Sequence, residues 1–365
     1  MGFWHDLKRP FFALAPMADV TDVAFRNIVA KYSRHGQPDG GPDVFWTEFV
    51  SVNGLLSEAK EILLRDLEYR EGEQPVVAQI FGDKPENFKE IARLCEEFGF
   101  AGIDINAGCP DKAICKQGAG SGMMRDIANT QEVIEACKEG APNTPISIKT
   151  RLGWSSDETD TWIKGLLEAR PAVLTVHVRT KTNMSKTCPE WGRLKNIVEL
   201  KNAISPETLI IANGGIRTTK AGKEIAKFTG CDGIMMGKAI FGNPWLFDEN
   251  LDHKAITIKE RIDAMLDHTR LFLAEMGEIG PSKDKTALVF GDNVSHDMTI
   301  DVKGKSFALL KKHFRAYVHG FHGAKELRTQ LMNSSSYQEI LDLTQAWTKD
   351  NPELAQSAPN EEYIV

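Results

Sequence analysis

The segment "DINAGCPDKAICKQGAGSG" (Asp104–Gly122) concentrates residue types that could do chemistry. Cys109 ends an apolar run, and Pro110 directly after it fixes a turn. The glycines from Gly118 to Gly122 would let the following loop fold closely around a ligand. Most free cysteines are small buried residues, but this position favours a functional thiol at the mouth of a cleft. We therefore predict a chemical role for Cys109, with Cys115 as a weaker candidate.

Two other ionisable side chains close apolar runs of the same kind. Lys149 ends "PISIKT", where it either reaches the surface or faces a buried anion or carbonyl group. His177 in "LTVHVR" is either a hydrogen-bonded structural residue or a functional one. Their occurrence on neighbouring runs favours a function for both.

Glycines mark the ends of two further runs. The motifs "NGG" (Asn213–Gly215) and "GK" (Gly237–Lys238) offer backbone N–H groups that no side chain obstructs, and Lys238 adds a positive charge. Barrel enzymes commonly hold phosphate in such a setting, although tight turns would need the same glycines. We predict that a phosphorylated cofactor binds there.

Eight apolar runs rich in β-branched residues carry these groups and alternate with helix-like stretches. The runs cover residues 11–17, 43–49, 75–82, 102–109, 145–151, 173–180, 208–215 and 231–239. Eight such repeats predict a (β/α)8 TIM barrel, whose functional groups come from the carboxyl ends of the strands. An open doubly wound sheet is the alternative, disfavoured because no GxGxxG follows the first run. At the predicted strand ends lie Pro16, Met17, Glu48, Gln79, Asn106, Cys109, Lys149, Arg151, His177, Arg179, Asn213–Gly215, Gly237 and Lys238.

The pattern changes after "GNPWLF", and no strand is expected from about Lys254 onward. Stretches such as "IKERIDAMLDHTRLFLAEM" have the spacing of amphipathic helices. We predict a barrel over residues 1–253, a smaller all-helical C-terminal domain over 254–349 and a flexible tail over 350–365. The segment 281–305 resembles an inserted loop without an assigned role.

Composition limits the classes of function. The 365-residue chain has a formal net charge of −7, which argues against non-specific coating of nucleic acid but allows a local basic surface. Six cysteines form no CxxC or Cys/His cluster, so we expect no metal site, no disulfide framework and reduced thiols in the cytoplasm. No apolar run approaches the roughly 18 residues of a membrane helix, and we expect no signal peptide. A monomer is the default expectation.

Motifs in order along the chain resemble the tRNA-dihydrouridine synthase family of flavin-dependent barrel enzymes. They are "APMADVTDVAFR", "TEFVSVNGL", "QIFGDKPENF", "INAGCPDKAICKQGAGSGMM", "KTRLGW", "LTVHVRTK", "IANGGI" and "GIMMGKAIFGNPWLF". The segment "LKKHFRAYVHGFHGAKELR" resembles the family's helical RNA-binding domain, so the match extends from about Ala15 to Arg328. Asp19 and Val178 stand where glycine is common in the family, and Lys238 stands where arginine is usual.

The resemblance implies reduction of the C5–C6 double bond of a tRNA uridine to dihydrouridine, with NADPH as reductant. It implies Cys109 as the proton donor, and a thiol with an ordinary pKa of about 8.5 is mostly protonated at neutral pH. Asn106, Arg151 and Arg179 become candidates for contact with the substrate. The implied FMN site consists of Pro16, Met17, Ala18, Gln79, Lys149, His177, Asn213, Gly214, Gly215, Gly237 and Lys238.

Basic residues near the C-terminus are expected to contact tRNA, with a solvated helix face as the alternative. They include Lys311, Lys312, Arg315 and Arg328. Nearby rings that could stack on RNA or bond to it belong to His313, Tyr317, His319 and His322. Two other functions stay open at this point. A flavin-dependent barrel reductase of a free small molecule would not need the basic helices, and an RNA-binding protein on a barrel scaffold would not be an enzyme.

Overall fold

The computed structural model describes residues 2–184, 186–276, 288–291, 294–296 and 304–359. Their contacts group into two compact units. The first unit comprises Met1–Asp22, Pro42–Lys238 and Leu288–His296, and the second comprises Val23–Gly41, Ala239–Ala287 and Asp297–Val365. Each unit draws on separate stretches of sequence, and the predicted domain boundary between residues 253 and 254 stays a prediction.

Eight parallel strands form the sheet of the first unit, in the order β1-β8-β7-β6-β5-β4-β3-β2. A parallel bridge between Ala13 and Val44 joins β1 to the chain just before β2 and closes the ring. The predicted (β/α)8 TIM barrel is therefore confirmed, with one strand at each expected run, and β2 extends two residues past the end of its run. The strands are β1 (Phe11–Leu14), β2 (Phe45–Ser51), β3 (Val76–Phe81), β4 (Gly102–Ala107), β5 (Ile146–Arg151), β6 (Val173–His177), β7 (Leu209–Asn213) and β8 (Gly233–Met236).

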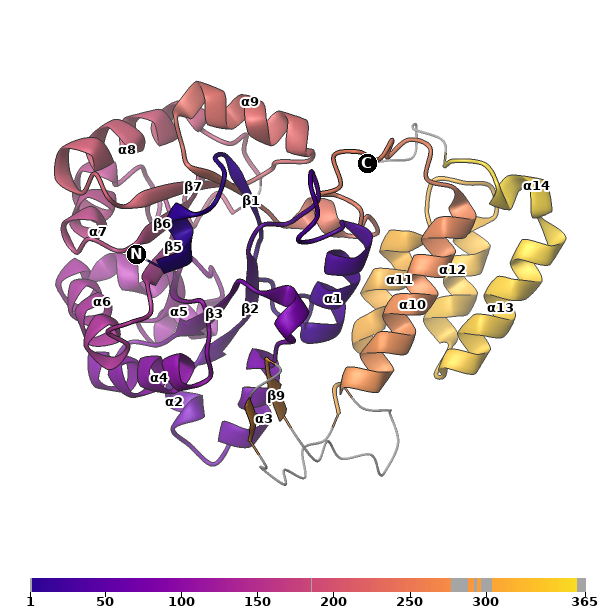
Figure 1. The fold of residues 1–365 in the computed structure, drawn as a ribbon, viewed down its shortest axis with the longest axis horizontal. Helices are drawn as coiled ribbons and strands as arrows, with labels where there is room; N and C mark the ends of the chain where they lie inside the picture. The colour runs from indigo at the N-terminus through magenta and orange to yellow at the C-terminus, as the bar shows by residue number, and fades with distance from the viewer. Residues whose placement is uncertain (1, 185, 277–287, 292–293, 297–303, 360–365) are drawn as a thin grey trace. The chain divides into compact units, whose positions relative to one another are not determined.

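Helices follow the strands and surround them on the outside, as the labels of the first unit show in Figure 1. Helix α4 illustrates their ends: Pro85 occupies its first turn, and Gly99 directly follows its C-cap with a φ of +77°. The helices are α2 (Val52–Leu55), α3 (Lys60–Leu64), α4 (Pro85–Glu97), α5 (Lys112–Lys116), α6 (Ile127–Gly140), α7 (Lys164–Glu168), α8 (Trp191–Ile204) and α9 (Thr219–Thr229).

Aromatic rings fill the amino-terminal end of the barrel. The ring of Trp4 lies 5.7 Å from that of Phe11 and 5.8 Å from that of Trp46, and all three residues are buried. Gly233 leaves room for Phe11, because a Cβ at this glycine would lie 2.4 Å from the phenyl ring. This end is therefore packed and apolar, and the ionisable groups gather at the carboxyl ends of the strands.

An antiparallel pair of short strands, β9 (Leu288–Phe290) and β10 (Val294–His296), belongs to the first unit. The prediction that no strand follows Lys254 is therefore wrong. Backbone hydrogen bonds join Tyr69 to Val289 and Gly291 at 3.1 Å each, and the Phe290 ring stacks on Phe98 at 4.1 Å. This anchoring comes from contacts with distant segments, which the periodicity of so short a stretch does not encode.

The second unit is helical. Helices α10 to α13 pack side by side in Figure 1, and α1 packs against α10 through an apolar cluster that includes Val23, Ala24, Ile262 and Met265. The helices are α1 (Val23–Tyr32), α10 (Ile258–Met276), α11 (Lys311–Tyr317), α12 (Ala324–Asn333), α13 (Tyr337–Asp350) and α14 (Pro352–Ala355).

The stretch expected as a flexible tail begins with an ordered segment. Helix α14 lies within it, and the Ser357 carbonyl accepts a hydrogen bond from the Ile258 amide at 2.9 Å. Residues 360–365 of that prediction lie outside the described residues. None of the helices described is long and apolar enough to cross a membrane.

Candidate active site

Cys109 lies two residues beyond the end of β4, in a turn built by Asn106. The Asn106 Oδ1 accepts hydrogen bonds from the backbone N–H groups of Gly108 at 3.1 Å and Cys109 at 2.9 Å. The Cys109 side chain is partly exposed, and burial raises the pKa of its thiol above the usual value. Cys109 is therefore a protonated thiol at neutral pH, held at the carboxyl end of the barrel.

Cys115 contacts the backbone of the turn that carries Cys109. Its Sγ lies 3.5 Å from the Cys109 carbonyl oxygen, which also accepts the Ser121 amide at 2.9 Å. Gly120 closes the same loop with a φ of +56°, and a Cβ there would lie 3.0 Å from the Cys109 carbonyl oxygen. The glycine-rich loop thus folds back onto the cysteine turn, as its composition predicts.

Gln79 on β3 and Asn106 on β4 meet through a hydrogen bond of 3.0 Å from Asn106 Nδ2 to Gln79 Oε1. Gln79 also donates to Asp104 at 2.6 Å, and the other oxygen of this carboxylate accepts from Ser147 at 2.6 Å. Asp104 is fully buried, and this desolvation raises its pKa to about 6. Sequence analysis missed Asp104 and Ser147. Their signal is the two-residue spacing of Asp104 from Asn106, which places both on one face of β4.

The cationic side of the site comes from β5. Lys149 pairs in register with Asn106, and burial together with the nearby Arg151 lowers its pKa to about 8. The Arg151 Nε donates to the Gly108 carbonyl at 2.8 Å, so this guanidinium supports the turn that carries Cys109. Both residues stand where the barrel prediction expects them, on the strand beside β4.

His177 at the end of β6 is neutral. Burial first, and then the charges of Arg151, Lys149, Arg179 and Lys238, lower its pKa to about 2. Its Nε2 lies 3.1 Å from the Arg179 Nη1. Because a guanidinium can only donate, Nε2 accepts this hydrogen bond and the ring proton sits on Nδ1. His177 thus lies buried among four cationic side chains.

Backbone cradles follow β7 and β8. Gly214 and Gly215 have φ values of +119° and +70°, and the Asn213 side chain donates to the Met235 carbonyl at 2.8 Å. A Cβ at Gly214 would lie 2.4 Å from the His177 ring, so only glycine fits there. Lys238 is exposed just beyond β8.

The loop after β1 lies beside Gly237, because a Cβ at this glycine would be 3.3 Å from that of Ala15 and 3.6 Å from the Met17 sulfur. Pro16, Met17 and Ala18 form this loop. Asp19 has a φ of +57° and its amide donates to Glu48. The left-handed backbone explains why glycine is common there, and aspartate is one of the residues that tolerate it.

The basic residues of the second unit differ in exposure. Arg315 is exposed, Lys311 and Lys312 are partly exposed, and Arg328 donates from Nη1 to the Val318 carbonyl at 2.8 Å. Arg328 therefore joins two parts of the helical unit, which is a structural contact.

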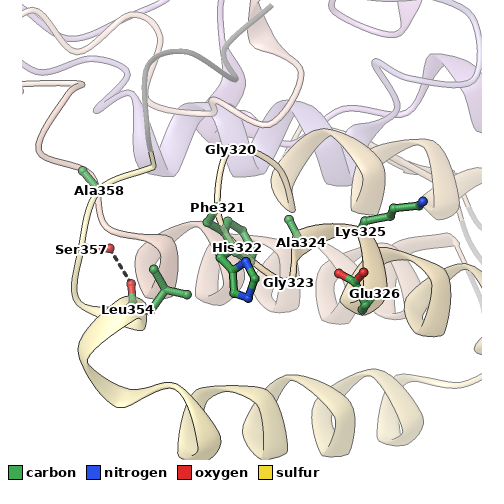
Figure 2. Close-up of a pocket in the computed structure, with 10 residues that line it drawn as sticks. All are labelled: Gly320, Phe321, His322, Gly323, Ala324, Lys325, Glu326, Leu354, Ser357 and Ala358. Atoms are coloured by element: carbon green, nitrogen blue, oxygen red, sulfur yellow. Dashed lines mark hydrogen bonds between the residues drawn. The ribbon is translucent and has the colours of Figure 1, made fainter.

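Two of the rings expected to meet RNA are buried. His313 and Tyr317 are 3% and 1% exposed, and the His313 ring stacks on Phe241 at 5.5 Å. The expectation that they stack on RNA is therefore wrong, because the apolar face of α11 turns them inward. His322 is exposed, beside a cavity of about 510 Å³. Figure 2 shows this cavity at the start of α12, lined by Gly320–Glu326, Leu354, Ser357 and Ala358.

Comparison with known proteins places the chain in a family. The model of the "Dihydrouridine synthase (Dus)" family matches residues 13–352. A protein of Bacillus subtilis (strain 168), "Probable tRNA-dihydrouridine synthase 2", is 37% identical over 93% of this chain and 94% of its own length. "Probable tRNA-dihydrouridine synthase" of Staphylococcus aureus (strain MRSA252) is 39% identical over 93% of each chain. A solved structure of morphinone reductase in complex with tetrahydroNAD is 13% identical, with a TM-score of 0.47, over 67% of this chain and 87% of that chain. The chain therefore belongs to the dihydrouridine synthase family and is an oxidoreductase that acts on a CH–CH group.

Proposed function

We propose that this enzyme reduces the C5–C6 double bond of a uridine in tRNA to give dihydrouridine, with FMN as its cofactor and NADPH as the reductant. The observation that carries the proposal is the meeting, at one end of the barrel, of a protonated thiol and a group of cations. The thiol belongs to Cys109, and the cations are Lys149, Arg151, Arg179 and Lys238. The names of the family and of its relatives support the substrate.

The residues present fit an anionic, phosphate-bearing cofactor. Lys149 lies beside Arg151, and burial followed by the charges of Arg151, Lys149, Arg179 and Lys238 lowers the pKa of His177. Gly214, Gly215 and Gly237 leave open backbone where side chains would intrude. We assign the phosphate to these glycines and Lys238, and the flavin ring to Gln79, Lys149 and His177, with Pro16–Ala18 and Asn213 completing the site. Lysine at position 238 offers a point charge in place of the fork that arginine would give.

Reduction of uracil adds a hydride at C6 and a proton at C5. When bound, FMN supplies the hydride, since redox chemistry of this kind belongs to the cofactor. Cys109 gives the proton to C5 and takes one back from solvent before the next turnover. Burial raises the pKa of this thiol, which keeps it protonated and therefore competent as an acid. Asn106 and Arg151 hold the turn from which it acts, and Arg179 is our candidate for contact with the substrate.

The FMN affinity of the apoenzyme is expected to depend on pH through Lys149. The pKa of about 8 makes this side chain cationic at pH 7 and mostly neutral at pH 9, so affinity falls as the pH rises through about 8. Quenching of FMN fluorescence measures the dissociation constant across this range. Lys149→Met is expected to bind FMN weakly at pH 7 and to lose the dependence. An unchanged pH profile in Lys149→Met would contradict the assignment.

The exposed cations of α11 are proposed to contact the phosphates of tRNA. The double substitution of Lys311→Ala with Arg315→Ala is expected to raise the KM for tRNA and leave kcat nearly unchanged. Each lost phosphate contact also lowers the slope of log K against log salt concentration by about 0.7–0.9. Lys349→Ala on α13, which removes another exposed cation, serves as the matched control. If Lys349→Ala had the same effect as the double variant, the loss of tRNA affinity would come from the overall charge of the protein and not from contacts made by α11.

Purified protein and unmodified tRNA test the function as a whole. With FMN, NADPH and tRNA that lacks dihydrouridine, the enzyme is expected to form dihydrouridine, detected by mass spectrometry of nuclease digests. A protein that stays colourless and takes up no FMN would favour the RNA-binding alternative. A protein that oxidises NADPH with free uridine or an enone, and leaves tRNA unmodified, would favour a reductase of small molecules. All six cysteines are free, which supports a reducing compartment, and we propose a cytoplasmic monomer.

A further inference from the structure

A continuous chain of hydrogen bonds runs through the barrel interior to the cysteine turn. Ser147 donates to Asp104 and Gln79 donates to the other oxygen of Asp104, each at 2.6 Å. Asn106 donates to Gln79 Oε1 at 3.0 Å, and Asn106 Oδ1 accepts the Cys109 amide at 2.9 Å. We call these four side chains and the Cys109 amide the interior chain. All four side chains are at most 7% exposed.

The register of the sheet explains this alignment. Gln79, Asp104 and Ser147 are partners in register across β3, β4 and β5, so they form one row inside the barrel. Asn106 and Lys149 form the next row, one step toward the carboxyl ends. The interior chain therefore leads from the first row to Asn106 in the second row, and from Asn106 to the turn that carries Cys109.

Between the Cys109 amide and Asp104, every hydrogen bond of the interior chain runs in the same direction, and the Ser147 hydrogen bond reaches Asp104 from the other side. A backbone N–H can only donate, and an ionised carboxylate can only accept. Between them, Gln79 and Asn106 each present one NH2 group toward Asp104 and one oxygen toward Cys109. A flip of either amide would set donor against donor or oxygen against oxygen. The Asp104 carboxylate thus locks the Gln79 amide, which in turn holds Asn106.

Packing alone does not account for a carboxylate at this place. Burial of an isolated carboxylate is costly, and a buried side chain without charge would fill the same space at lower cost. The compensation that Asp104 receives comes from two hydrogen bonds and from the charge of nearby Lys149. The carboxylate is therefore placed where it orients polar groups.

We propose that Asp104 is a positioning residue, which acts through Gln79 and Asn106 to fix the turn that presents Cys109. The proposal rests on the proposed function only in that Cys109 is the proton donor there. The effect of Asp104 on the turn that carries Cys109 involves only the protein's own residues, and it can be measured in the apoenzyme without flavin or tRNA.

The first test compares Asp104→Leu, Asp104→Asn and Ser147→Ala. In Asp104→Leu the Gln79 amide loses its acceptor, so iodoacetamide is expected to alkylate Cys109 of the apoenzyme faster, as measured by mass spectrometry of the Cys109 peptide. The kcat for tRNA is expected to fall by up to about 10²-fold with little change in KM. Asp104→Asn keeps an oxygen for Gln79 and is expected to restore both values toward wild type. Ser147→Ala removes a hydrogen bond to the same carboxylate but spares Gln79, so its alkylation rate stays near that of wild type.

A second pair of variants tests the direction of the hydrogen bonds and covers the case in which Asp104→Leu fails to fold. Gln79→Glu opposes two carboxylates and is expected to release the turn. Adding Asp104→Asn returns a donor to this contact, so the double variant is expected to regain slow alkylation of Cys109. Absence of this rescue, or equal effects of Ser147→Ala and Asp104→Leu, would overturn the proposal. A fully active Cys109→Ala would exclude Cys109 as the proton donor instead, and would not affect the alkylation rates of the other variants, which are measured on Cys109 itself.

Discussion

Replacement of Cys109 by alanine is expected to slow dihydrouridine formation by about 10²–10⁴-fold, the usual cost of losing a general acid. The thiol contributes the proton that C5 requires, and the hydrogen bonds that Asn106 and Ser121 make with the turn involve the Cys109 backbone, which alanine keeps. FMN content and tRNA affinity should therefore stay near those of wild type. Single-turnover assays of dihydrouridine formation separate this loss from any change in binding.

Cys115→Ala is the matched control for Cys109→Ala. The Cys115 thiol touches the same turn, through the Cys109 carbonyl at 3.5 Å, but belongs to the short helix α5, six residues further along the chain. We expect a small effect from this substitution. Equal losses of dihydrouridine formation in the two variants would indicate that both thiols only stabilise the loop. A fully active Cys109→Ala would exclude Cys109 as the acid.

Gly214→Ala is expected to remove FMN binding and to lower thermal stability. The new Cβ would lie 2.4 Å from the His177 Cδ2 and 2.8 Å from Nε2, at a φ of +119° that side chains rarely adopt. Backbone strain of this kind costs about 1–3 kcal/mol, and displacement of His177 adds to it. The FMN content of the purified protein and its thermal unfolding midpoint measure the two effects.

Gly192→Ala provides the control on a neighbouring helix. This glycine lies in the first turn of α8, is exposed, and has no atom within 4 Å of an added Cβ. Alanine there should be neutral or stabilise by up to about 1 kcal/mol, since glycine is the poorer helix former. If Gly214→Ala behaved like Gly192→Ala, the tight contact with His177 would have no consequence for the site.

The sequence was sufficient for the barrel and for most of the proposed site. Runs of β-branched residues specify buried parallel strands, and the carboxyl ends of such strands must meet at one end of a barrel. That rule alone brought together Gln79, Asn106, Lys149 and His177 from four separate runs. The hydrogen bonds among them depend on register, which a single run does not reveal.

Other features arise from contacts between distant segments, and the local patterns of the sequence did not predict them. The stretch "ALVF" around β9 is too short for its periodicity to separate strand from loop, and its partner at Tyr69 lies over two hundred residues earlier. His313 and Tyr317 look like RNA contacts because they sit among basic residues, but the face of α11 that carries them is buried. Asp104 was not predicted because the sequence of one strand does not reveal which residues of the neighbouring strands form hydrogen bonds with it.

The place of α1 has a consequence for the order of folding during synthesis. This helix is made early, yet its packing partner α10 follows more than two hundred residues later. At about 5–20 residues per second, the apolar face of α1 waits roughly 10–50 s before that partner leaves the ribosome. The helical unit therefore cannot complete itself as an autonomous C-terminal module, and exchanging it between relatives by a single crossover would separate α1 from the helix against which it packs.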